Sequence, residues 1–175
     1  MTAEPDAPVE GHDGPYAAPI VTPQATVRPE WIDYNGHMNV AYYIVAMDGS
    51  LDWVLEHELG LGEGRVKRAE RGPYTLQMHI HYLDEMLEGA AFYCRTRLLD
   101  HDAKRMHLFT EMVREADETV AATVEQLVIN VDLTTRRSAP YPDWAQARLA
   151  GMAAAHAGLA RPAQVGAILG IRRRG

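Results

Sequence analysis

The sequence predicts an α+β domain in which one long helix packs against an antiparallel sheet. Apolar residues recur at helical spacing from Val40 to Leu59, and the spacing changes to two after Tyr74. The later strand-like runs are joined by short connections, "HDA" and "ADE", that suit hairpins. We therefore expect a curved antiparallel sheet of about five strands wrapped around a single central helix.

The first strand and the helix follow each other closely. The run "ATVRPEWID" has strand-like residues, but Pro29 lacks an amide donor and indicates an edge or a bend. Asn39 suits the N-cap of the helix and Gly60 suits its end. The apolar stripe of the helix consists of Val40, Tyr43, Ile44, Met47, Leu51, Val54 and Leu55.

Four further strands and a final helix complete the expected domain. The strand-like runs are "YTLQMHIHYL", "AAFYCRTRLLD", "KRMHLFTEMVRE" and "TVAATVEQLVINVD", and a helical run spans about Pro142 to Ala157. His79 and His81 share one strand face, a spacing that could bind a metal. Since no third ligand stands at a supporting spacing, we expect no metal site.

The ends of the chain differ in composition from its middle. Residues 1–23 hold five prolines and little periodicity, so we expect a mobile N-terminal arm. Residues 24–157 form the expected domain. Residues 158–175 form a C-terminal tail that ends in Arg172, Arg173 and Arg174.

Composition narrows the possible functions. The net charge of −7 disfavours general binding to nucleic acid or to anionic membranes. A single cysteine, Cys94, excludes an internal disulfide and suits a buried small hydrophobe. The acidic, proline-rich start does not resemble a secretory signal, and no apolar run has the length of a membrane span. We expect a cytoplasmic protein.

The segment "WIDYNGHMNVAYY", residues 31–43, joins the first strand to the helix and is named here the seam. A helix N-terminus offers unpaired N–H groups that stabilise negative charge on a carbonyl oxygen. Asp33 is a carboxylate that could activate water or attack the carbonyl, and Gly36 allows close backbone approach. An ordinary turn also explains an Asp-Tyr-Asn-Gly run.

The seam resembles the active-site segment of the hotdog-fold acyl-CoA thioesterases, in the 4-hydroxybenzoyl-CoA thioesterase-like branch. Asp33, Gly36 and the run "GHMNVAYY" carry this resemblance. Together with "YTLQMHIHYL" and "VEQLVINVD", the seam resembles the thioesterases associated with carnitine degradation, which act on betainyl-CoA. Those enzymes are fused to, or encoded beside, carnitine dehydrogenase. The resemblance covers about Thr26 to Asp132.

The resemblance implies roles for individual residues. Asp33 corresponds to the catalytic carboxylate, and the backbone N–H of Val40 would bind the thioester oxygen. Some relatives carry a histidine or tyrosine at the position of Val40. Because valine is aliphatic, no side chain can assist catalysis at this position in the present sequence. His37 would orient the loop or touch the substrate, and Asn39 suits a cap. Asp48, two turns into the helix, is the alternative acid, as in a second branch of these thioesterases.

Substrate recognition would need aromatic and basic side chains. A trimethylammonium acyl group suits an aromatic cage, for which Trp31, Tyr34, Tyr42 and Tyr43 are the candidates, although packing in the core or in a dimer interface is the more ordinary role of each. Coenzyme A carries phosphates, for which the available cations are Lys104, Arg105, Arg136, Arg137 and the terminal arginines.

These residues lead to one main hypothesis and two alternatives. The main hypothesis is a thioesterase that hydrolyses a short-chain acyl-CoA and needs no cofactor. The resemblance indicates betainyl-CoA as that substrate. The alternatives on the same fold are a non-catalytic acyl-CoA sensor and an enoyl-CoA hydratase that uses Asp33 and His37. Open sheet edges predict a homodimer or homotetramer, and functional association with carnitine dehydrogenase is implied by the resemblance.

Overall fold

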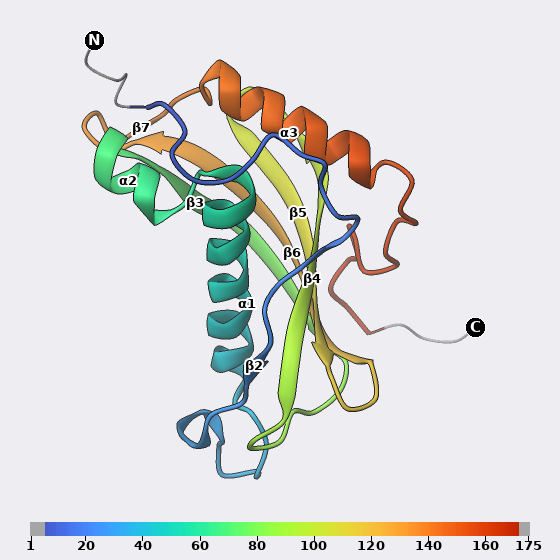
Figure 1. Ribbon diagram of the computed structural model, residues 1–175. Helices are drawn as coiled ribbons and strands as arrows, with labels where there is room; N and C mark the ends of the chain where they lie inside the picture. Colours follow the sequence, from blue (N-terminus) through green and yellow to red (C-terminus); the bar gives the residue numbers. More distant parts are fainter. Residues whose placement is uncertain (1–5, 172–175) are drawn as a thin grey trace.

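Helix α1 (Val40–Val54) lies across one face of a curved, seven-stranded antiparallel sheet (Figure 1). The computed structural model describes residues 6–171. The sheet has the order β1-β4-β5-β6-β3, with β2 paired to β4 and β7 paired to β6. Its long strands are β3 (Arg71–Tyr82), β4 (Ala91–His101), β5 (Arg105–Arg114) and β6 (Thr119–Asp132). The expected α+β architecture is confirmed.

Three strands are only two residues long, and one of them replaces the first strand that the sequence predicts. These are β1 (Ile20–Val21), β2 (Ala25–Thr26) and β7 (Arg137–Ser138). After β2 the chain turns through the 3₁₀ helix η1 (Pro29–Trp31). Pro29 fixes φ near the helical value and cannot donate to a strand ladder, so the strand-like run ends at Thr26 and the bend expected at Pro29 is confirmed.

The apolar stripe of α1 forms the core against the sheet. Tyr43, Met47, Leu51 and Val54 are all buried, and full burial of a large apolar side chain contributes about 1.5–3 kcal/mol. The helix continues through one π-helical turn, η2 (Leu55–Leu59), and ends at Gly60 with φ of 68°. Helix α2 (Glu63–Ala69) follows.

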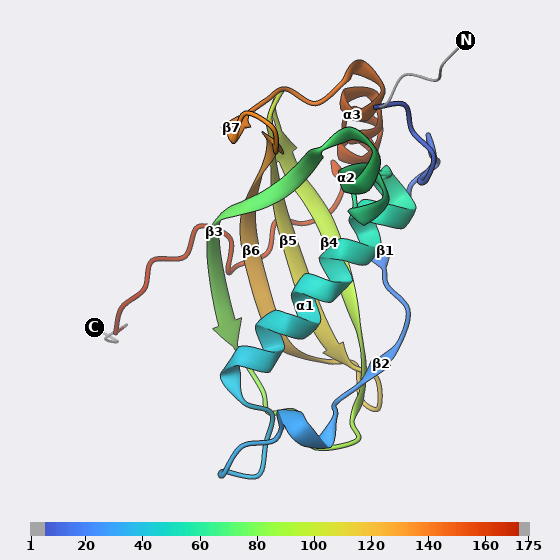
Figure 2. The ribbon, with the colours of Figure 1, turned by 90° about the vertical axis from the view of Figure 1, so that its left-hand side faces the viewer.

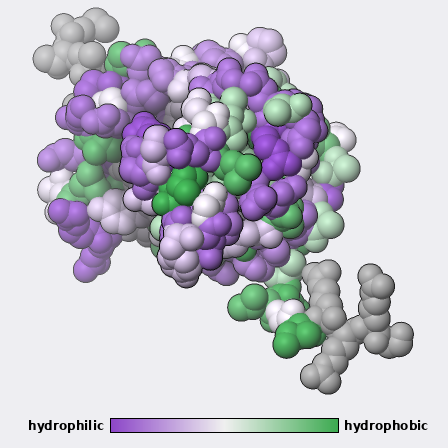
Figure 3. All heavy atoms as spheres, turned by 90° about the horizontal axis from the view of Figure 1, so that it is seen from below, coloured by the Kyte–Doolittle hydropathy of each residue, from purple (hydrophilic) through white to green (hydrophobic). Residues whose placement is uncertain are grey.

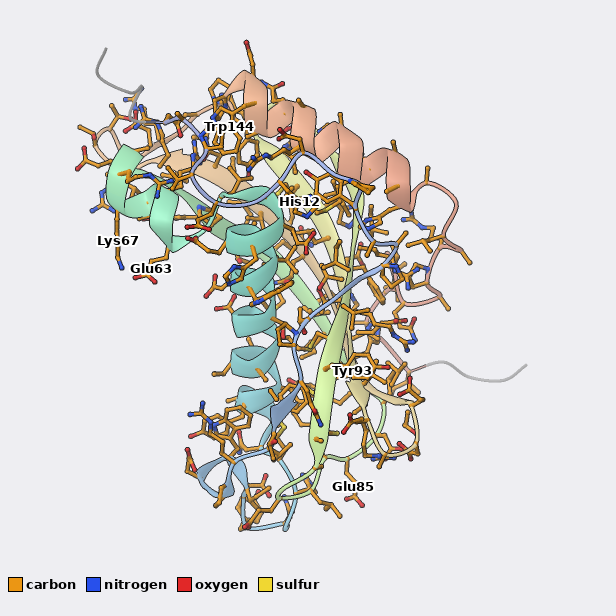
Figure 4. The ribbon with its side chains drawn as sticks, in the orientation of Figure 1. His12, Glu63, Lys67, Glu85, Tyr93 and Trp144 are labelled. Carbon is orange, nitrogen blue, oxygen red and sulfur yellow. The ribbon has the colours of Figure 1, made fainter. Side chains whose placement is uncertain are left out.

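The described part of the N-terminal segment is packed against the domain, which differs from the expected mobile arm. Ile20 is 1% exposed and lies in β1. Asp6 forms an ion pair with buried Arg65 at 2.6 Å, and its carbonyl accepts from Trp144 Nε1 (Figure 4). Polar contacts from the domain therefore hold residues 6–23 in place, and a sequence pattern cannot reveal such long-range partners.

Arg148 is the main cation that anchors this segment. Its guanidinium donates to the carbonyls of Glu10 and Leu59 and to the Asp13 carboxylate at 2.8–3.0 Å. The same group lies 5.1 Å from the centre of the Trp144 ring. Arg148 comes from helix α3 (Asp143–His156), so one side chain joins the N-terminal segment, α3 and the end of η2.

We predict that Arg148→Leu lowers the free energy of unfolding by about 1–3 kcal/mol for each carbonyl left unpaired. It should also expose the segment before Ile20 to proteolysis. Asp13→Asn is the matched control, because the Asp13 side chain is 88% exposed and such pairs contribute about 0–1 kcal/mol. Denaturant titration and limited proteolysis measure both effects, and equal behaviour of the two variants would contradict this anchoring role.

His156 secures the other end of α3 to the sheet. Its Nδ1 accepts from the Leu98 N–H at 2.9 Å, so Nε2 carries the proton and donates to the Ala17 carbonyl at 2.8 Å. Burial lowers the pKa of His156 below its usual value, since this neutral form satisfies both neighbours and the charged form is poorly solvated.

We predict a pH dependence of stability from His156. Because its folded-state pKa lies below the unfolded value of about 6.5, the unfolded chain binds the proton first as the pH falls. The stabilisation is complete above pH 6.5 and is lost below it, by at most about 1.4 kcal/mol per pH unit. His156→Gln should remove this component in unfolding titrations between pH 7.5 and about 5. An unchanged slope would exclude the role.

The C-terminal segment crosses the face of the sheet opposite α1. Arg97 donates to the Ala160 carbonyl at 2.9 Å, and the Gly166 N–H donates to Glu125 at 2.7 Å. The segment then extends past the edge formed by β3 (Figure 2). The predicted cationic end, Arg172 to Arg174, lies outside the described residues. Within residues 6–171, no helix combines the length and the apolar character that a bilayer crossing requires.

Candidate active site

The seam forms a tight loop that places Asp33 directly before the start of α1. Ile32 and Met38 form an isolated antiparallel bridge, the Asp33 N–H donates to the His37 carbonyl, and the Gly36 N–H donates to the Asp33 carbonyl, both at 3.0 Å. Gly36 has φ of +83°, a left-handed conformation that favours glycine. The loop therefore depends on glycine at this position.

The Asp33 carboxylate is only partly engaged. Its Oδ1 accepts from the Asn35 N–H at 2.7 Å, and no described residue donates to Oδ2. Asp33 is half-buried, whereas Asn35 and Gly36 are exposed. The end of the molecule that carries the seam is mostly hydrophilic, with small apolar patches between the polar groups (Figure 3). One carboxylate oxygen is thus free to act in a position that solvent can reach.

The N-terminus of α1 supplies the complementary group. The Asn39 side chain accepts from the Ala41 N–H at 3.0 Å, which confirms Asn39 as the N-cap. The N–H of Val40, the first residue of the helix, has no acceptor within residues 6–171. It carries the partial positive charge of the helix end and can donate to a carbonyl oxygen.

Hydrogen bonds from residues far along the chain position the start of α1, and the sequence did not predict them. The Tyr82 hydroxyl donates to the Val40 carbonyl at 3.1 Å. Burial raises the pKa of Tyr43, whose hydroxyl accepts from the Met86 N–H at 3.0 Å and donates to the Asp84 carbonyl at 3.3 Å. Tyr82 stands at the end of β3, 42 residues from Val40, so no local pattern in the sequence predicts this contact.

The His37 imidazole contacts the backbone of the seam. Its Nδ1 lies 3.2 Å from the Met38 carbonyl, so this ring nitrogen donates when it carries a proton. The side chain is half-buried. This contact ties the imidazole to the loop backbone next to Asp33, as the loop-orienting interpretation of His37 expects.

The four aromatic candidates do not form one cage around Asp33. Trp31 is buried, stacks on Tyr42 with ring centres 5.7 Å apart, and has the Arg28 guanidinium 5.2 Å from its ring centre. Tyr43 is buried in the core, whereas Tyr34 is 97% exposed. The structure brings Trp31 and Tyr42 together and leaves Tyr34 apart from them.

The alternative acid and the candidate cations lie away from the seam. Asp48 is exposed on α1, two turns or about 12 Å from Val40. The cations occur at the opposite end of the sheet, because the register pairs the end of β6 with the start of β3. There Arg105 pairs with Asp102 at 2.5 Å and Arg136 donates to the Tyr74 hydroxyl at 3.2 Å.

Most of the chain matches a known protein family. Residues 27–149 match the model of the thioesterase-like superfamily. The chain belongs to that superfamily. Its class is therefore that of the thioester hydrolases, and the hotdog fold expected from the sequence is confirmed.

Individual relatives agree with this assignment. The chain is 34% identical to a betainyl-CoA thioesterase of Pseudomonas aeruginosa over 152 residues, which is 87% of this chain and 95% of that protein. It is 34% identical to an L-carnitine dehydrogenase/betainyl-CoA thioesterase of Rhizobium meliloti, over 90% of this chain and 31% of the relative. The chain thus spans about a third of that larger protein.

A solved structure supports the same conclusion. A hypothetical protein of Staphylococcus aureus in complex with CoA superposes with a TM-score of 0.81 at 28% identity. The superposition covers 91% of this chain and all of the Staphylococcus chain.

We predict that Asn39→Ala lowers the free energy of unfolding by about 1 kcal/mol, since Asn39 is the cap of the helix that carries the Val40 N–H. Asn39→Asp is the matched control, because aspartate caps a helix about as well. Denaturant titration compares the three proteins. A loss of stability that is equal in both variants would show that the cap does not account for the effect.

Proposed function

We propose that this chain hydrolyses betainyl-CoA to betaine and CoA. The observation that carries the proposal is that one short loop holds both the Asp33 carboxylate and the start of α1, where the N–H of Val40 is unpaired. Relatives that are named betainyl-CoA thioesterases match over most of this chain, which supports the choice of acyl group.

The thioester carbonyl oxygen accepts from the Val40 N–H, where the helix end stabilises the charge that develops on it. Asp33 then acts by one of two routes. As a general base it removes a proton from water, and the hydroxide attacks the carbonyl carbon. As a nucleophile it attacks the carbon itself and forms an anhydride that water cleaves. In both routes the C–S bond breaks and the CoA thiolate leaves and takes up a proton.

The remaining parts of the site have supporting roles. Gly36 and His37 shape the loop that holds Asp33, and Asn39 fixes the first turn of α1. Trp31 and Tyr42 stack on each other next to the seam, and Tyr43 holds the segment after β3. No step of this mechanism uses a cofactor.

The proposal also covers the oligomeric state, the cellular location and a functional partner. The open β3 edge supports a homodimer, or a homotetramer built from dimers. A cytoplasmic location fits the acidic composition and the CoA thioester substrate. Functional association with carnitine dehydrogenase is supported by the relative of Rhizobium meliloti, whose name joins both activities.

We predict that Asp33→Asn reduces the turnover of betainyl-CoA by about 10²–10⁴-fold, because an amide can neither take a proton from water nor form a reactive anhydride. Asp48→Asn is the matched comparison and should retain most of the activity. Release of free thiol measures both variants, and circular dichroism verifies that they are folded.

Two results would overturn this assignment. An active Asp33→Asn beside an inactive, folded Asp48→Asn would move the chemistry to the exposed face of α1. Wild-type protein that is folded but releases no thiol from any member of an acyl-CoA panel would exclude the thioesterase function.

A further inference from the structure

Asn35 and Gly36 form an asparagine–glycine pair in the turn of the seam. The seam projects from the end of the molecule where α1 begins, as two views show (Figure 1, Figure 2). Both residues are exposed, and a Cβ built on Gly36 would meet no atom within 4 Å. The pair therefore lies in open space beside Asp33, and the mechanism above does not use the Asn35 side chain.

An asparagine that precedes a glycine is prone to deamidation. The backbone nitrogen of the glycine attacks the side-chain carbonyl carbon of the asparagine, and the bond from that carbon to the amide nitrogen breaks. The amide nitrogen leaves as ammonia and takes the proton of the glycine N–H with it. Water then opens the resulting succinimide ring to aspartate or isoaspartate. Glycine favours the attack because it has no Cβ to hinder its nitrogen.

The chain contains three asparagines, which allows a direct comparison. Asn39 and Asn130 are each followed by valine, whose branched side chain crowds the backbone nitrogen. Asn39 Oδ1 accepts from the Ala41 N–H at 3.0 Å, and buried Asn130 accepts from Arg65 at 2.9 Å. Asn35 precedes glycine, is exposed, and its side-chain amide makes no hydrogen bond with the described residues. Sequence, exposure and hydrogen bonding thus all favour reaction at Asn35.

The fold of the seam slows this reaction without blocking it. The Gly36 N–H donates to the Asp33 carbonyl at 3.0 Å, and the Asn35 N–H donates to Asp33 Oδ1 at 2.7 Å. The first of these hydrogen bonds must open before the Gly36 nitrogen can attack, because that nitrogen loses its proton. Exposed loops open locally at little cost in free energy. We therefore expect the folded chain to react more slowly than the unfolded chain.

Deamidation at this position changes the loop that holds Asp33. Isoaspartate adds a methylene to the backbone between residues 35 and 36. This addition falls inside the span that is closed by the Ile32–Met38 bridge and by the hydrogen bond from the Asp33 N–H to the His37 carbonyl. A longer backbone displaces one side of this span against the other. Both products also carry a carboxylate, which opposes the negative charge that develops on the thioester carbonyl.

We propose that Asn35 is a site of spontaneous deamidation that limits the active lifetime of this chain. The modification itself does not depend on the proposed function. The loss of activity rests on that function, because it follows from the displacement of Asp33 relative to the start of α1. The modified chain carries isoaspartate in an exposed loop, where an L-isoaspartyl methyltransferase can reach it.

Tandem mass spectrometry tests the modification site. Wild-type protein is incubated at mildly alkaline pH and digested, and each asparagine is followed over time. We expect residue 35 to gain the mass that separates a hydroxyl from an amino group, and an L-isoaspartyl methyltransferase with S-adenosylmethionine to methylate the same peptide. Protein unfolded in guanidinium chloride should react faster at this residue. Native Asn35 that reacts no faster than Asn39 or Asn130 would overturn the proposal.

A glutamine variant tests the link between modification and activity. Asn35→Gln keeps an amide, but its attack would have to close a six-membered ring, so its deamidation is far slower. Release of free thiol from betainyl-CoA is measured for each protein relative to its own initial rate. Wild-type activity should fall in proportion to the fraction modified at Asn35, whereas Asn35→Gln should keep its initial rate over the same incubation.

The outcomes separate this inference from the proposed function. Loss of activity in Asn35→Gln at the wild-type rate, or full activity in wild-type protein that is modified at Asn35, would overturn the effect on active lifetime. Wild-type protein that releases no thiol even before incubation would instead contradict the proposed function. The mass measurement decides the modification site in either case, because it does not require activity.

Discussion

The burial of one face of α1 against the sheet is the constraint on which the other features of this molecule depend. Met47, Leu51 and Val54 are at most 3% exposed and lie between the helix and the inner sheet face. The free energy of removing this stripe from water fixes the direction and the rotation of the helix. It thereby also fixes where the helix begins, where it ends and which of its residues remain exposed.

The position of the helix start gives the candidate site its chemistry. A helix N-terminus stabilises negative charge only where its N–H groups remain unpaired, and the Asn39 cap leaves the Val40 N–H free. The Ile32–Met38 bridge and the turn at Gly36 then keep the Asp33 carboxylate on the same loop. The local geometry is maintained by backbone contacts, with Tyr82 holding the helix start from β3.

The exposed face of α1 has a different character from the buried one. It combines carboxylates, a glycine without neighbours and an indole beside a cavity. Asp48 and Asp52 lie one turn apart, and this like-charge pair disfavours the isolated helix.

The sequence by itself determined the elements and the chemistry of the seam. Period and capping residues are local properties, so the long helix, its Asn39 cap and the four long strands could be predicted from neighbouring residues. Only the tertiary structure decided that residues 6–23 pack on Arg148, that Arg28 covers Trp31 and that Asp52 and Trp53 share a cavity with Pro73. These contacts join residues far apart in the chain, and their energies depend on burial and geometry that no local pattern encodes.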